Sequence, residues 1–86
     1  MPEICRFFGI VIAMYYNDHA PPHFHARYGS GRVLIDIETL SVLRGNLSPR
    51  ALGLVVEWAR IHQDELRENW RLAQRQAELQ RISPLE

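Results

Sequence analysis

Three of the four histidines in this 86-residue sequence, His19, His23 and His25, fall within seven consecutive positions. Histidine is the side chain that titrates closest to neutral pH, so a cluster of histidines can supply proton-transfer groups, metal ligands or a pH-sensitive charge. Pro21 and Pro22 lie between the first histidine and the second, and they stiffen the backbone because each proline fixes φ and restricts the residue before it. The sequence therefore predicts a chemical site built on a rigid bend.

The second and third histidines open a segment, 23–28, in which polar and apolar residues alternate. Such alternation is typical of a β-strand with one buried face. It predicts that Phe24, Ala26 and Tyr28 point into the core, whereas the two histidines share the opposite face with Arg27. We expect that histidine-bearing face to be open.

A second alternating segment follows a Gly-Ser-Gly turn and predicts a hairpin with the first. Cross-strand neighbours must point to the same side of the sheet, so two registers remain. In the first register His23 lies opposite Asp36, and the next histidine in the strand faces Leu34. In the second register His23 lies opposite Glu38, and His25 faces the aspartate. Either register brings histidines next to carboxylates.

Three interpretations of this cluster compete. In the first, it binds a divalent transition metal ion such as zinc, which takes imidazole nitrogen and carboxylate oxygen ligands at about 2.0–2.2 Å. Two histidines at i and i+2 on one strand face, together with loop residues before the prolines, offer such ligands. The ligands would be Asp18, His19, His23 and His25.

In the second interpretation the histidines act as general acid and base. One imidazole takes a proton from a nucleophile, and another returns a proton to the leaving group. With an arginine to stabilise phosphate charge, this is the equipment of metal-independent RNA cleavage, in which the ribose 2′-hydroxyl attacks. The catalytic residues would be His19, His23, His25 and Asp36, with Arg27 binding phosphate and Glu38 in support.

In the third interpretation the histidines are structural. Exposed rings then pair with carboxylates across the strands and stabilise the sheet by about 0.2–1 kcal/mol. Residue type and spacing do not separate these three interpretations, so the sequence leaves open whether the protein is an enzyme.

Composition narrows the class of protein. The length allows one domain, residues 1–86, with a core that buries roughly 60–65% of the unfolded chain's surface. No stretch of about 20 apolar residues is present to span a membrane. The N-terminal residues lack the pattern of a secretory signal and Cys5 is the only cysteine, so we expect a cytoplasmic protein without disulfides. The formal net charge of zero argues against attraction of the whole molecule to nucleic acid, but not against a local basic patch.

A long C-terminal helix is the clearest predicted element. Ser48 can cap its N-terminus, Pro49 suits the first helical position, and apolar residues then recur at spacings of three and four. We predict an α+β fold in which this helix, continuous or else bent or split near residue 62, packs on a small antiparallel sheet of three to four strands. The predicted strands are 8–16, 23–28, 32–38 and an optional one at 41–43; the helix is 49–77, and 79–82 is a candidate terminal strand.

The first half of the predicted helix carries a second apolar stripe, Leu54, Trp58 and Ile61, away from the stripe that faces the sheet. A helix that is apolar nearly all round is buried on two sides. We therefore expect this side to contact a second copy of the chain, forming a homo-oligomer, or a small partner protein.

Four blocks of the sequence, 6–10, 14–26, 36–38 and 68–70, together resemble a small prokaryotic family, domain of unknown function 4160. The likeness spans essentially the whole chain, and the run Asp-His-x-Pro-Pro-His-x-His is its most specific part. The segment 40–45 departs from the family pattern, because apolar Leu40 occupies an expected polar turn. The hallmark residues carried over by position are Asp18, His19, Pro21, Pro22, His23, His25, Asn69 and Trp70.

The resemblance implies one half of a toxin–antitoxin pair, since members of the family are suspected of that role. We accordingly expect a toxin–antitoxin component that acts on RNA. The alternatives are a non-enzymatic module that binds a metal or a partner through the same histidines, and a regulator of transcription. The residues expected to support the site are Pro21, Pro22, Glu38, Asn69 and Trp70.

Overall fold

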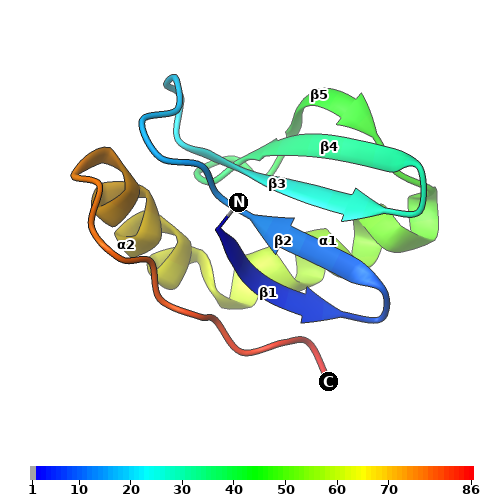
Figure 1. Cartoon of the computed structure of the whole chain (residues 1–86). Coiled ribbons are helices and arrows are strands. Elements are labelled where there is room, and N and C mark those ends of the chain that lie inside the picture. The colour runs from blue at the N-terminus through cyan, green and yellow to red at the C-terminus, as the bar shows by residue number, and fades with distance from the viewer. Residues whose placement is uncertain (1) are drawn as a thin grey trace.

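The structure, a computed structural model that describes residues 2–86, contains a five-stranded antiparallel sheet and two helices (Figure 1). Consecutive strands are neighbours in the sheet. The elements are β1 (Glu3–Phe7), β2 (Ile10–Ala13), β3 (His23–Tyr28), β4 (Gly31–Asp36), β5 (Val42–Asn46), α1 (Pro49–Ile61) and α2 (Gln63–Gln74). The predicted α+β class is confirmed, whereas the predicted number of strands, three to four, is wrong. The predicted strands 23–28, 32–38 and 41–43 correspond to β3, β4 and β5.

The additional strand, β1, arises from a turn within the predicted strand 8–16. Phe8 and Gly9 have φ angles of 49° and 80°, and a tight two-residue hairpin turn requires this left-handed conformation at both central positions. The chain therefore reverses at this point, and Phe7 pairs with Ile10. The predicted strand 8–16 is wrong in extent, because its first two residues form the turn and only its middle forms β2.

One face of the sheet packs against α1, which lies behind the strands in the view of Figure 1. Phe24 and Ala26 of β3 are buried, as predicted, and the Phe24 ring meets the Trp58 indole edge-on at a centroid separation of 5.9 Å. Tyr28, predicted to lie in the core, is 45% exposed. That prediction is wrong because Tyr28 ends β3 beyond the core, where its ring lies next to Gly9 of the neighbouring turn.

The predicted single helix, 49–77, is two helices divided at His62. The division lies where the sequence left open a bend or split, and Asp64 and Glu65 supply the negative charge that stabilises a new helix N-terminus. The Gln63 side chain donates hydrogen bonds of 2.7 and 3.0 Å to two backbone carbonyls that follow β4. These bonds hold α2 across the end of the sheet at which β3 begins (Figure 1).

The residues after α2 form an extended segment, and the predicted terminal strand 79–82 is wrong. Within the described chain this segment makes one backbone hydrogen bond to the sheet, from Ile82 N–H to the Ile4 carbonyl at 2.9 Å, which is too few for a strand. Asn69 of α2 holds the segment in place, because its side chain donates to the Gln80 carbonyl and accepts from the Gln80 N–H. Asn69 was predicted to support the histidine site, but its side chain binds the C-terminal segment instead.

The same segment covers part of the second apolar stripe of α1. Trp58 is completely buried, and its indole N–H donates to the Ser83 carbonyl at 2.8 Å. Leu54 is half-buried, and Ile61 remains 64% exposed. The chain thus covers, by itself, the tryptophan at the centre of the surface that the sequence analysis assigned to a partner. Within residues 2–86, neither helix has the length and apolar character needed to cross a membrane.

Candidate functional site

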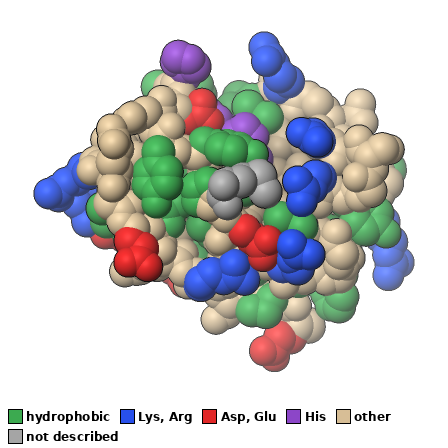
Figure 2. Space-filling view, in the orientation of Figure 1, with side chains coloured by type: hydrophobic (Ala, Val, Ile, Leu, Met, Phe, Trp, Pro, Cys, Tyr) green, Lys and Arg blue, Asp and Glu red, His purple; other side chains and the backbone are tan. Residues whose placement is uncertain are grey.

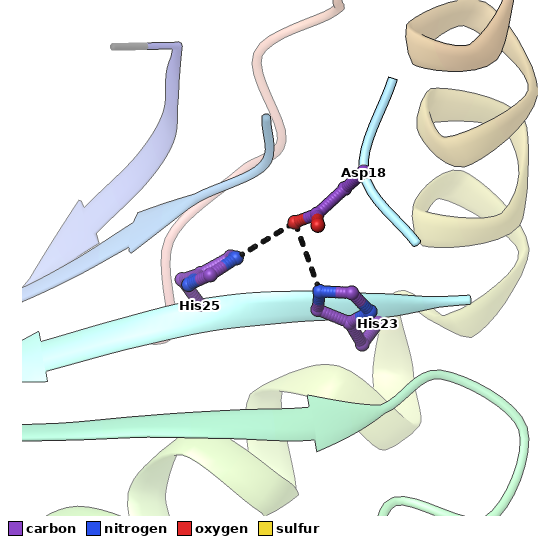
Figure 3. Close-up of side chains that lie close together, drawn as sticks. All are labelled: Asp18, His23 and His25. Carbon is purple, nitrogen blue, oxygen red and sulfur yellow. Dashed lines mark hydrogen bonds and ion pairs between the residues drawn. The ribbon is translucent and has the colours of Figure 1, made fainter. Parts of the chain in front are cut away.

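Asp18, His23 and His25 converge at one end of the sheet (Figure 3). The Nε2 atoms of His23 and His25 lie 3.0 and 3.1 Å from the same carboxylate oxygen, Asp18 Oδ2. One ligand atom from each of the three side chains lies within 4.8 Å of the other two. The structure therefore brings together three of the four residues that the metal interpretation selected.

β3 positions the two histidines. They occupy alternate positions on the strand, so their side chains leave the face opposite to Phe24. The register places His23 opposite Asp36 and the next histidine opposite Leu34, which confirms the first of the two predicted registers.

The loop before β3 positions the carboxylate. Asn17 adopts a left-handed φ of 56°, and its N–H points to the Ala73 carbonyl at the end of α2. The Gln74 side chain donates to the Asp18 carbonyl at 3.3 Å. Asp18 Oδ1 accepts the backbone N–H of His19 at 2.9 Å, so Oδ2 is the oxygen left for the two imidazoles.

The two prolines supply carbonyls that fix the start of β3. His23 Nδ1 donates to the Pro21 carbonyl at 2.8 Å, and the Pro22 carbonyl accepts the backbone N–H of Ile37 at 3.0 Å. The Ala20–Pro21 peptide bond is cis. Both prolines therefore support the site, the first by orienting an imidazole and the second by joining β3 to the chain after β4.

Aromatic rings hold the imidazoles in place. His23 is 5% exposed and packs against Trp70 of α2, a predicted supporting residue, at a centroid separation of 5.3 Å. His25 is partly exposed and meets the Tyr15 ring edge-on at 4.5 Å. Tyr15 was not predicted as a site residue, and its signal in the sequence is only its place between β2 and the histidine loop.

The surroundings of Asp18 change the pKa of its carboxyl. Partial burial on its own raises the pKa of the Asp18 carboxyl. Hydrogen bonds from His25 and from the His19 backbone N–H, with the proximity of His23, lower that pKa by more, so it lies below its ordinary value. The carboxylate is therefore charged at neutral pH and offers its oxygen to a cation.

Three of the predicted histidine and carboxylate residues lie outside the cluster. The His19 ring is exposed and does not join the other two. Asp36 was expected to orient an imidazole, but its Oδ1 accepts the backbone N–H groups of Glu38 and Thr39 and so closes the turn after β4. Glu38 binds the Arg67 guanidinium through both carboxylate oxygens. The first predicted register was right, yet Asp36, which it placed opposite His23, has other partners.

The donor set fits a transition metal ion. Imidazole nitrogen and carboxylate oxygen are ligands for zinc, iron, copper and nickel, and two histidines with one carboxylate form a recurrent facial set. Two ligands with bonds of about 2.1 Å lie about 3.0 Å apart at a right angle and about 3.4 Å apart at the tetrahedral angle. The two distances from Asp18 Oδ2 lie at the lower end of that range.

Comparison with known proteins agrees with the motif. Residues 9–71 match the family described as Domain of unknown function (DUF4160), and this range includes Asp18, both clustered histidines and Trp70. No curated protein and no solved structure matches the chain. The match extends over most of the sequence, and the chain belongs to the DUF4160 family.

Proposed function

We propose that this protein binds one divalent transition metal ion through Asp18, His23 and His25. The observation that carries the proposal is the convergence of two imidazole Nε2 atoms on a single carboxylate oxygen. Any one of these residues alone would be unremarkable on a sheet surface. Together they form three ligands from two elements of the fold, a strand and the loop that precedes it.

The hydrogen bonding of His23 supports a cation at this point. A carbonyl oxygen can only accept, so the Pro21 carbonyl fixes the proton of His23 on Nδ1. In the neutral ring Nε2 then carries a lone pair, which faces a carboxylate oxygen at 3.0 Å. A metal ion between the two atoms replaces that repulsion by attraction. Metal-binding histidines usually donate their other ring N–H to a carbonyl or carboxylate, as His23 does.

The site leaves coordination positions free. Three protein ligands with an open fourth position are typical of catalytic zinc, whereas structural zinc is closed by four ligands. His23 lies on the buried side of the cluster, while the side chains of His25 and Asp18 are 27% and 22% exposed. Water or a substrate group would approach from the side of His25.

A second candidate function is metal-free cleavage of RNA by the same histidines, as the toxin of a toxin–antitoxin pair. The observation that favours it is the partly exposed His25 ring, with Arg27 two residues further along the same strand face. In this mechanism Asp18, not Asp36, orients the imidazoles. The burial of His23 disfavours it, because both the acid and the base must reach the substrate.

Metal content distinguishes the two candidates. The protein is purified without a histidine tag, its metals are measured by inductively coupled plasma mass spectrometry, and the apo form is titrated with zinc by calorimetry. We expect one ion per chain, and we expect His25→Ala and Asp18→Ala to abolish binding.

Two matched controls test the ligand set. His62→Ala removes a histidine that hydrogen-bonds to Glu65 and packs on Trp58, and His19→Ala removes the exposed histidine of the motif. Both variants should retain the ion. Zinc binding by His25→Ala equal to that of the parent, with the circular dichroism spectrum unchanged, would refute the proposal.

A further inference from the structure

Three arginines lie on the sheet face opposite α1, one on each of three neighbouring strands. Arg27 of β3 pairs directly with Arg32 of β4. Arg44 of β5 pairs with Leu34, which is two residues beyond Arg32 and on the same face. His25 lies on this face too, two residues before Arg27. Figure 2 shows arginine side chains over the strands on the face turned to the viewer.

These arginines lack acidic partners. Among residues 2–86 no carboxylate lies within 4.0 Å of Arg27, Arg32 or Arg44, although arginines elsewhere form ion pairs. Strands β2 to β5 contain one acidic residue, Asp36, and it is engaged by the turn after β4. The net charge of zero therefore conceals a local basic surface.

The direct pairing of Arg27 with Arg32 is unfavourable for folding. Like charges opposite one another in a sheet destabilise it, since their side chains are close neighbours. A pair of this kind without a carboxylate nearby is explained by a ligand that brings negative charge. Arginine also suits phosphate in particular, because its planar fork donates two parallel hydrogen bonds.

A shallow depression connects the arginines to the histidine cluster. Its lining includes Tyr15, His25, Arg27 and Arg32. Surfaces that bind single-stranded nucleic acid combine a positive track for the backbone with aromatic rings for the bases. Tyr15 is 36% exposed beside this track and supplies the ring.

We infer that this face binds single-stranded RNA, with Arg27, Arg32 and Arg44 contacting the phosphates and Tyr15 contacting a base next to His25. The exposed face of a sheet can bind single-stranded RNA, as it does in RNA-binding domains built on a β-sheet, and most single-stranded nucleic acid in a cell is RNA. The inference names the ligand class for the site proposed above and depends on that proposal for its link to the metal. The binding itself depends on the arginines and Tyr15 and needs no metal ion.

The test measures filter binding of a labelled RNA of about 12 nucleotides, with and without zinc, at 50 and 200 mM salt. Three phosphate contacts predict that affinity falls roughly 20-fold between these salt concentrations. The single variants Arg27→Gln, Arg32→Gln and Arg44→Gln should each reduce that fall to about 7-fold. The triple variant should bind weakly at both salt concentrations.

Arg60→Gln is the matched control, because Arg60 is exposed on α1 and forms no ion pair within residues 2–86. It should bind like the parent. Absence of binding with and without zinc, or equal binding by the triple variant, would overturn the inference. Equal affinity for DNA of the same sequence would overturn the assignment to RNA.

Metal analysis of the same proteins separates the two proposals. The triple arginine variant should retain its zinc, since none of its changes touches Asp18, His23 or His25. Arginine-dependent RNA binding by a protein that takes up no metal would sustain this inference and refute the proposed metal site. The reverse result would refute this inference alone.

Discussion

The two faces of β3 differ in nearly every physical property although they belong to the same six residues. On the side of α1, Phe24 and Ala26 are almost completely buried among apolar side chains. On the other side lie His23, His25 and Arg27. Because a strand alternates its side chains, one face can carry the core while the other carries the chemistry. Neighbouring residues of this strand are therefore subject to different physical requirements, packing for one face and polar contacts for the other.

The faces also differ in how they are stabilised. Burial of Phe24 contributes about 1.5–3 kcal/mol through apolar area removed from water. Burial of His23 is unfavourable unless its ring nitrogens have partners. Its Nδ1 has the Pro21 carbonyl, whereas its Nε2 faces the Asp18 carboxylate. Stability alone does not explain a buried imidazole that needs two specific partners, whereas a ligand site does.

The largest effect should come from the core face. Phe24→Ala removes a ring that packs on Trp58 and leaves a cavity, so we expect a loss of about 3–5 kcal/mol in the free energy of unfolding. Urea denaturation followed by circular dichroism measures the loss. A cost below about 1 kcal/mol would show that this face is not the core.

A smaller effect, the stabilisation of the folded protein by zinc, should distinguish variants of the two faces. At a free zinc concentration of about 100 times Kd, a folded-state site stabilises the protein by about 2.7 kcal/mol. The core variant Ile35→Val should keep this gain, because Ile35 lies on the other face. His25→Gln should lose it. The same gain in both variants would place the zinc elsewhere.

The smallest effect should have the opposite sign. Arg32→Thr removes one member of the Arg27–Arg32 pair and inserts a residue with good β propensity, so we expect it to stabilise the protein by about 0.2–1 kcal/mol. Urea denaturation at low and high salt checks this, since salt screens the repulsion and should reduce the gain. A loss of stability at low salt would contradict the view that the pair is unfavourable for folding.

Alternation made β3 and its register predictable. The requirement that Phe24 and Ala26 face the core left two registers, and the structure has one of them. The same pattern placed His23 and His25 on one face. The metal interpretation also included Asp18, which lies in the loop, as a ligand on the basis of residue type alone.

The choice of carboxylate was not predictable from register. Register places Asp36 opposite His23, but a side chain can bind only where its oxygens are free. Asp36 closes a turn by accepting the N–H groups of Glu38 and Thr39. An aspartate side chain often accepts the backbone N–H two residues further along the chain in this way. That local signal was present in the sequence and competes with cross-strand pairing.

Other parts of the fold depended on contacts between distant segments. The Phe8–Gly9 turn was not predicted, because Phe8 is of a residue type that favours strands, although it adopts a positive φ in the structure. The position of α2 depends on its hydrogen bonds to the chain after β4, and the role of Asn69 depends on the C-terminal segment. Periodicity contains no information about these partners.

The two tryptophans lie next to opposite faces of β3. Trp58 is sealed in the core against Phe24, whereas Trp70 lies against the ring of His23. The molecule therefore contains two intrinsic fluorophores, one for each face of β3. Replacing Trp58 by phenylalanine leaves an emission signal that reports on the imidazole environment, and replacing Trp70 leaves one that reports on core integrity, without any attached dye.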